Sequence, residues 1–309
     1  MIFDAVVCVG PHKVQTAKLA IRSLQFFARP RRIYTIVNSK FFAELRSLPE
    51  NGCPITLIDE DAFIEAVSLP ALEQYLTQRT GTSHGAGWYL QQFLKMAIAR
   101  LPDVAGHYLI WDSDTIMLQP VEFFDANGRV LVNPKEEHHK PYFELTEKLL
   151  GFGRSVSFSF ISEHFMVNTG YMRELLQTIE SRAPGAKNWV YAILDQITVE
   201  NLKHSGFSEF ETYGNFLQVH HPESYCCRPL NSSRTGATFF GMSPNKWDVY
   251  YLLKQDYCFV SFERWNRKKG WRLWPAKIRS AGIYAFDCAS NIVSGRNKRE
   301  LEIAAALCN

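Results

Sequence analysis

Two aspartates, one residue apart, follow a short apolar run in this sequence. Asp112 and Asp114 come directly after Tyr108–Trp111 and shortly before Ile116–Leu118, runs that are typical of buried strands. Burying two ionised carboxylates at the end of a core strand costs several kcal/mol each unless a positive group lies between them. Mg²⁺ and Mn²⁺ prefer oxygen ligands, and Mg²⁺ in phosphate chemistry takes one or two carboxylates together with phosphates and water. The spacing therefore predicts a metal-bridged phosphate.

The same residues have an ordinary structural interpretation as well. Asp-Ser-Asp-Thr at 112–115 is good turn chemistry, because Asp and Ser side chains bond neighbouring backbone amides. The position of the motif between two apolar runs favours the metal interpretation. Lys95 also has two interpretations, since it lies opposite the apolar stripe of a predicted helix and faces either a phosphate or solvent.

Strands and helices alternate along the chain before the aspartates. Apolar runs predict strands at Phe3–Val9, Arg32–Asn38 and Pro54–Asp59, and helical spacing of apolar residues predicts helices over His12–Phe27 and Trp88–Leu101. This alternation predicts an α/β fold with a mostly parallel central sheet flanked by helices. Neither a dinucleotide-binding glycine fingerprint nor a Walker-type phosphate loop accompanies it.

Composition restricts the remaining classes of protein. At 309 residues, with 46% hydrophobic residues, the chain suits one large globular domain or two intimate ones. A formal charge of +3 is too small to indicate nucleic-acid binding. We find no evident signal peptide and no apolar stretch of membrane-spanning length. Seven cysteines without paired spacing predict neither a zinc site nor a disulfide framework, so we expect a cytoplasmic protein.

Three segments in this order resemble a known family of enzymes. Gly87–Lys95, Tyr108–Thr115 and Phe165–Gly170 together are similar to bacterial glycosyltransferases of the GT-A fold, over roughly residues 1–220. The resemblance implies a GT-A-like single domain in which a nucleotide-binding sheet ends in an Asp-x-Asp motif. It makes residues 1–220 the nucleotide-sugar-binding and catalytic core, and residues 221–309 an acceptor-side C-terminal extension packed on that core.

The resemblance also implies an activity. A sugar would move from a nucleotide-diphosphate sugar, a UDP-sugar first of all, to a glycan or lipid-linked acceptor in envelope, capsular or lipopolysaccharide biosynthesis. Mn²⁺ or Mg²⁺ would assist departure of the nucleotide, with Asp114 as a direct ligand and Asp112 on the metal through water or on the ribose. Val9, Gly10 and Pro11 would lie at the base of the nucleotide.

Further site residues follow from the same resemblance and from the chemistry. Many such folds add a C-terminal His to the metal, which makes His220 and His221 candidates after the apparent strand Asn215–Val219; otherwise they form a solvated turn. An inverting enzyme, the outcome we expect, needs a carboxylate base. Glu209 and Glu211, in a polar and aromatic segment, are preferred over Glu163 and Asp195.

The basic and aromatic segment Arg264–Trp274 has two open interpretations. It interleaves five cations with three tryptophans, a composition that favours peripheral contact with an anionic inner membrane. Tryptophans of this kind also pack against a domain while the cations keep it soluble.

Two other functions remain open. Haloacid-dehalogenase-like phosphatases carry Asp-x-Asp after an apolar strand, but their motif continues with Thr or Val where this chain has Ile116, and it usually opens the fold. A non-catalytic nucleotide-sugar-binding protein would retain the aspartates without turnover.

Overall fold

A five-stranded sheet forms the centre of the protein. The computed structural model describes residues 1–266, 273–289 and 295–308. The strand order is β3-β2-β1-β4-β7, with β7 antiparallel to β4 and the other neighbours parallel. The strands are β1 (Asp4–Val9), β2 (Ile33–Val37), β3 (Ile55–Asp59), β4 (His107–Trp111) and β7 (His164–Asn168).

The central strands form because their apolar runs are covered on both faces. Every residue of β1 and β2 is buried, as expected for a parallel sheet between two helical layers. Asp4, the carboxylate in β1, is satisfied because Arg31 Nε and Nη2 donate to it at 2.9 and 2.7 Å and the Ala105 amide donates at 2.8 Å. The predicted α/β fold with a mostly parallel central sheet is confirmed.

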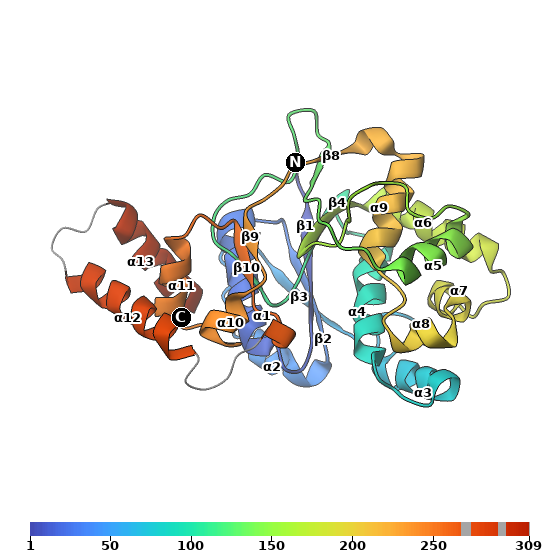
Figure 1. The fold of residues 1–309 in the computed structure, drawn as a ribbon, viewed down its shortest axis with the longest axis horizontal. Coiled ribbons are helices and arrows are strands. Elements are labelled where there is room, and N and C mark those ends of the chain that lie inside the picture. The colour runs from blue at the N-terminus through green and yellow to red at the C-terminus, as the bar shows by residue number, and fades with distance from the viewer. Residues whose placement is uncertain (267–272, 290–294, 309) are drawn as a thin grey trace.

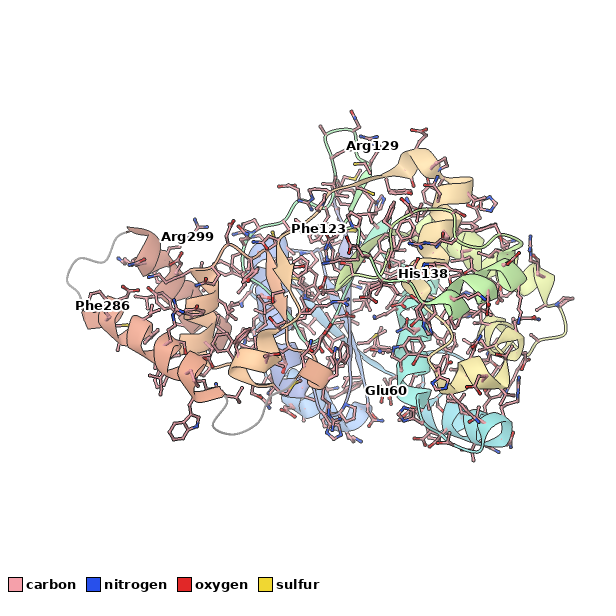
Figure 2. The ribbon with its side chains drawn as sticks, viewed as in Figure 1. Glu60, Phe123, Arg129, His138, Phe286 and Arg299 are labelled. Atoms are coloured by element: carbon pink, nitrogen blue, oxygen red, sulfur yellow. The ribbon has the colours of Figure 1, made fainter. Side chains whose placement is uncertain are left out.

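Helices lie on both sides of this sheet (Figure 1). On one side are α1 (Val14–Ser23), α2 (Phe42–Leu45), α10 (Gly236–Phe240), α11 (Lys246–Leu253), α12 (Trp274–Ala289) and α13 (Gly295–Cys308). On the other are α3 (Leu69–Thr80), α4 (Ala86–Ala97), α5 (Lys140–Leu150), α6 (Thr169–Arg182), α7 (Trp189–Gln196), α8 (Val199–Lys203) and α9 (Glu209–His220). Side chains fill the space between the layers (Figure 2). No helix in the described ranges is both long and apolar enough to cross a membrane.

Two smaller sheets join the C-terminal third of the chain to the rest. β5 (Thr115–Met117) pairs antiparallel with β10 (Phe259–Ser261), which pairs parallel with β9 (Ser232–Ser233). β6 (Val130–Val132) pairs parallel with β8 (Tyr225–Cys227). The expected C-terminal extension is therefore hydrogen-bonded to the preceding part of the chain through two sheets. The domain boundary at residue 220 stays a prediction.

Several segments differ from their predicted structure. The expected strand Asn215–Val219 lies inside α9, because the Ser208 hydroxyl accepts the Glu211 amide at 3.3 Å and starts a helix of 12 residues there. Residues 237–242 resemble a strand by composition, but 237–240 belong to α10, and Gly236 begins that helix against the backbone of Ser261. In the basic and aromatic segment, Arg264–Asn266 is a 3₁₀ turn, and residues 267–272, with most of its cations, lie outside the described residues.

Candidate functional site

The site lies where the order of the central strands reverses. β1 pairs with β2 on one side and with β4 on the other, and the helices next to these strands, α1 and α4, cover opposite faces (Figure 1). In open α/β sheets, ligands bind at such a switch point, beyond the carboxyl ends of the strands. Gly10 follows β1 and Asp112 follows β4, so both loops open into the same region.

The two aspartates are held at this edge by backbone contacts. The Asp112 amide donates to the Glu163 carbonyl at 3.1 Å, and the Thr115 amide donates to the Asp112 carbonyl at 3.0 Å, closing a turn. The Asp112 side chain is 34% exposed, whereas that of Asp114 is 6% exposed and contacts Lys13 Nζ through Oδ2 at 2.8 Å. Burial raises the pKa of Asp114; Lys13 opposes this rise and the Asp112 charge adds to it. Both aspartates therefore face positive groups already present in the fold.

Lys95 is a buried ion-pair partner of Asp112. Its Nζ donates to Asp112 Oδ1 and to Glu209 Oε1, both at 3.0 Å, and its side chain is only 6% exposed. Burial alone would lower the pKa of Lys95, but the two carboxylates outweigh it and raise the pKa above its ordinary value. Lys95 is thus charged, and it links α4, the end of β4 and the start of α9.

A second cluster of charged side chains lies next to the aspartates. Of its members, only Glu163 is a candidate site residue from the sequence alone. Arg234 Nε contacts Glu163 Oε1 at 3.0 Å and Glu263 Oε1 at 3.3 Å, and its Nη1 contacts Glu137. Burial raises the pKa of Glu263 to about 7; Arg234 opposes the rise, and Asp114 and Asp112 add to it. Glu263 follows β10, so the rule that polar residues at strand ends form sites could have indicated it.

Two cavities open beside these charges. One, of about 320 Å³, is lined by Gly10, Pro11, His12, Lys13, Met242 and Arg264. It contains two of the three residues expected at the nucleotide base, and the third, Val9, is the buried end of β1. The other, of about 420 Å³, is polar and lined by Lys135, Glu136, Glu137, Glu163, Ser232 and Arg234.

The two carboxylates expected to act as a base are buried. The Glu209 side chain is 3% exposed and forms an ion pair with Lys95. Burial raises the pKa of Glu209, and Lys95 opposes this rise. Glu211 is fully buried, where it accepts from Ser159 Oγ at 2.5 Å and from Asn215 Nδ2 at 3.2 Å. Neither lines either of the two cavities beside the charges: Glu209 positions Lys95, and Glu211 bonds Ser159 and Asn215. Their role as a base stays a prediction.

The histidines expected to bind metal lie at the opposite end of α9. With a rise of about 1.5 Å per residue, His220 is about 16 Å along the axis from Glu209, which reaches Lys95. His221 Nε2 contacts Glu174 Oε2 at 2.7 Å and its ring stacks on Tyr171 at 3.7 Å. The helix therefore carries His220 and His221 away from Glu209 and Lys95, and their role as metal ligands stays a prediction.

The aspartates suit a cation that is bound together with a phosphate. Among the described residues, no three His, Cys, Asp or Glu side chains gather as a metal cage. Mg²⁺ requires no such cage, because one or two carboxylates suffice when phosphates and water supply the other oxygens. Asp112 is exposed enough to accept such a cation, and Lys13 lies beside Asp114, where a phosphate would also find a positive charge.

Comparison with known proteins identifies a family. Residues 11–235 match the family described as Family of unknown function (DUF6492), and the chain belongs to it. No curated protein matches the sequence significantly. Among solved structures, mouse xyloside xylosyltransferase 1 in its apo form is similar, with 15% identity, a TM-score of 0.45, and coverage of 87% of this chain and 99% of that one. A galactosyltransferase, LgtC, solved with donor and acceptor sugar analogues, has 10% identity, a TM-score of 0.44 and coverage of 99% and 97%.

Proposed function

We propose that this member of the family of unknown function is a glycosyltransferase that uses a nucleotide-diphosphate sugar, with UDP-sugars as the first donors to test. One observation carries the proposal: Asp112 and Asp114 end β4 at the switch point of the sheet, beside the cavity that Gly10 and Lys13 line after β1. This arrangement offers carboxylates for a metal-bound pyrophosphate and a neighbouring cavity for the base and ribose.

The donor would be held by groups of both signs. Asp114 and Asp112 would hold Mn²⁺ or Mg²⁺, which when bound supplies Lewis-acid stabilisation of the departing nucleoside diphosphate. Lys13, 33% exposed and 2.8 Å from Asp114, would contact the pyrophosphate. Lys95 would keep Asp112 in place through its 3.0 Å contact.

The acceptor would enter the polar cavity at the other side of the aspartates. In the reaction, the bond between the anomeric carbon and the donor phosphate oxygen breaks, and a bond from that carbon to an acceptor hydroxyl oxygen forms. Inversion requires a base that removes the hydroxyl proton. Glu137 lines this cavity with 44% of its side chain exposed, and it is the carboxylate we propose for that role beside Glu209 and Glu211. A glycan of envelope, capsular or lipopolysaccharide type is the acceptor class we propose.

Calorimetry with nucleoside diphosphates tests the proposal. We expect UDP, or another member of a panel that includes GDP, CDP and ADP, to bind only with Mn²⁺ or Mg²⁺. Asp114→Asn should weaken this binding at least tenfold, or about 1.4 kcal/mol. Asp103→Asn, at an exposed aspartate paired with Arg32, is the matched control and should bind like the wild type.

Two results would contradict the proposal. One is that no nucleoside diphosphate in the panel binds with either metal. The other is that Asp114→Asn binds as tightly as the wild type. If a donor binds, NMR of the product identifies the anomeric configuration, and a retained configuration would remove the base from the mechanism.

A further inference from the structure

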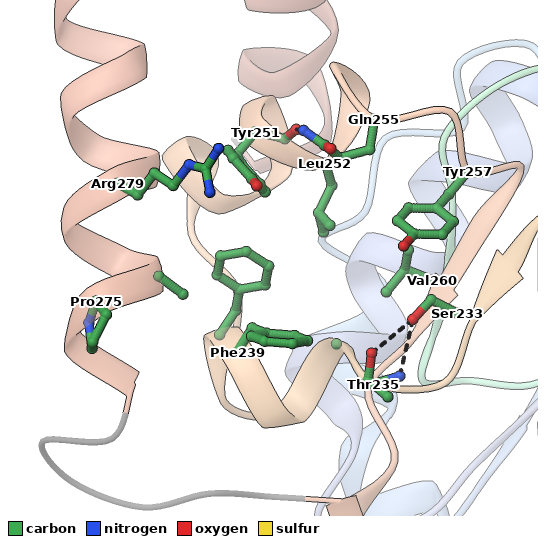
Figure 3. Close-up of a pocket in the computed structure, with 13 residues that line it drawn as sticks. Ser233, Thr235, Phe239, Tyr251, Leu252, Gln255, Tyr257, Val260, Pro275 and Arg279 are labelled. Carbon is green, nitrogen blue, oxygen red and sulfur yellow. Dashed lines mark hydrogen bonds between the residues drawn. The ribbon is translucent and has the colours of Figure 1, made fainter.

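A third cavity, of about 410 Å³, lies on the C-terminal side of the molecule, away from the aspartates. Its walls come from the β9–α10 segment, α10, α11, β10 and the first turns of α12 (Figure 3). Most of the lining is apolar or aromatic, including Phe239, Phe240, Leu252, Val260, Pro275 and Ala276. A cavity of this size with such walls takes an apolar ligand with few polar contacts.

The polar groups of this apolar pocket are mostly satisfied within the protein. The hydroxyls of Ser233 and Thr235 bond each other at 2.8 Å, and Gln255 Nε2 donates to the Tyr251 carbonyl at 3.2 Å. Arg279 differs, because its guanidinium lies 5.6 Å from the Tyr251 ring and is in no ion pair within the part of the chain that the structure describes (Figure 3). A ligand with an apolar chain and an anionic group matches this combination.

The nearby lysines show why Arg279 stands out. Lys254 contacts Asp287 at 2.5 Å and Lys277 contacts Asp248 at 2.7 Å, so the charges of both are compensated inside the protein. Arg279 is exposed at the rim of the pocket, so its guanidinium can pair with an anionic group of a ligand.

Exposed apolar side chains lie on two of the helices that form the pocket. Phe239 is 50% exposed on α10, and α12 presents Trp274, Ile278 and Phe286 at 66%, 65% and 73% exposure. Phe286 lies toward the far end of α12, at the outer end of the molecule (Figure 2). Exposed apolar side chains on a helix beside a cation are suited to contact with a lipid.

One segment separates the apolar pocket from the polar cavity. Ser232 and Arg234 line the polar cavity, whereas Ser233 and Thr235 line the apolar pocket. This is the alternation of sides expected of extended backbone. A molecule held in the pocket is thus only one strand away from the charged group around Arg234.

We infer that the apolar pocket binds the hydrocarbon chain of a lipid phosphate, with Arg279 at the phosphate, and that the acceptor of the transfer reaction is such a lipid-linked molecule. The identification as acceptor rests on the proposed function, whereas the binding of a lipid phosphate does not. The pocket supplies apolar walls for the chain, and Arg279 at its rim supplies a cation for the head group.

Calorimetry of the full chain with dodecyl phosphate, below its micellar concentration and without nucleotide, tests the inference. We expect one site. Ala276→Phe, which fills the pocket, should weaken binding at least tenfold, whereas Ala285→Phe adds the same ring at an exposed position of α12 outside the pocket and should bind like the wild type. Arg279→Gln should weaken binding about fivefold or more, and Arg299→Gln on the exposed side of α13 should not.

Several outcomes would overturn the inference. They are no binding of dodecyl phosphate, equal binding by both phenylalanine variants, or a dimer of the wild type that Ala276→Phe dissociates, which would make a second copy the occupant. If Ala276→Phe does not fold, the Arg279→Gln variant tests the inference by itself, because Arg279 is exposed and its replacement does not disturb the core. If dodecyl phosphate does not bind but nucleoside diphosphates do, the proposed function stands and the lipid site is wrong. If dodecyl phosphate binds but no nucleoside diphosphate does, the lipid site stands and the proposed function is wrong.

Discussion

Replacing Lys95 by Met should destabilise the protein by about 3–5 kcal/mol at pH 7, the cost of leaving a buried charge without its partner. Lys95 Nζ lies 3.0 Å from both Asp112 and Glu209. At an effective dielectric constant of about 20, each contact contributes roughly 5–6 kcal/mol of attraction before desolvation is subtracted. The ion pair with Asp112 contributes less to stability, because the Asp112 side chain is 34% exposed and water screens its charge. Glu209, at 3% exposure, therefore dominates the loss.

Urea unfolding at pH 7 and pH 5, followed by tryptophan fluorescence, measures this loss. In Lys95→Met, Glu209 must either stay charged without a partner or take up a proton, and protonation is easier at pH 5. The deficit relative to the wild type should therefore shrink at pH 5. The double variant Lys95→Met with Glu209→Gln should recover most of the stability at pH 7, since no buried charge is then left unpaired.

A matched surface pair provides the control. Lys140, 79% exposed, contacts Glu144 at 3.1 Å four residues later in α5, and Lys140→Met should cost less than about 0.5 kcal/mol. A loss of less than about 1 kcal/mol in the Lys95→Met variant at pH 7 would contradict this role of Lys95, and so would a double variant with Glu209→Gln that is no more stable than Lys95→Met alone.

Two further predictions concern Glu263 and Gly214. Because the native protein keeps the Glu263 proton up to a pKa of about 7, the stability from this group is full below the ordinary carboxyl range and falls as the pH rises toward 7. Glu263→Gln should flatten that decline by at most about 3 kcal/mol, measured by urea unfolding between pH 4 and 8; an unchanged slope contradicts the assignment. A Cβ at Gly214 would lie 2.1 Å from the Phe160 ring, so Gly214→Ala should destabilise by about 1–3 kcal/mol, whereas Gly282→Ala, with open space around it, should stabilise α12 by about 0.5–1 kcal/mol in thermal unfolding.

The central strands and the aspartates were predictable because their signals are local. An apolar run that is covered on both faces forms a strand wherever it occurs, and polar residues that follow it lie at the edge of the sheet. Asp112 and Asp114 needed no information from elsewhere in the chain. Their roles in metal and donor binding stay predictions.

The partners of the aspartates could not be predicted in the same way. Arg234 and Glu263 lie more than a hundred residues later in the chain and arrive through the antiparallel pairing of β5 with β10. The surroundings of Glu209 and His220 could not be predicted, because α9 begins where the sequence shows a polar and aromatic segment. A helix there buries Glu209 at one end and carries His220 away at the other.

The pairing of β5 with β10 also has a consequence for how the chain is made. Thr115 and Ser261, whose hydroxyls bond at 2.6 Å, are separated by 146 positions, so β5 emerges from the ribosome long before its partner. Until then β5 is an unpaired edge strand, and such edges invite association with other chains. Contacts between distant parts of a chain also form slowly. We therefore expect that the nascent protein needs protection at β5 during synthesis, and that the aspartates acquire Arg234 and Glu263 only after β10 has been translated.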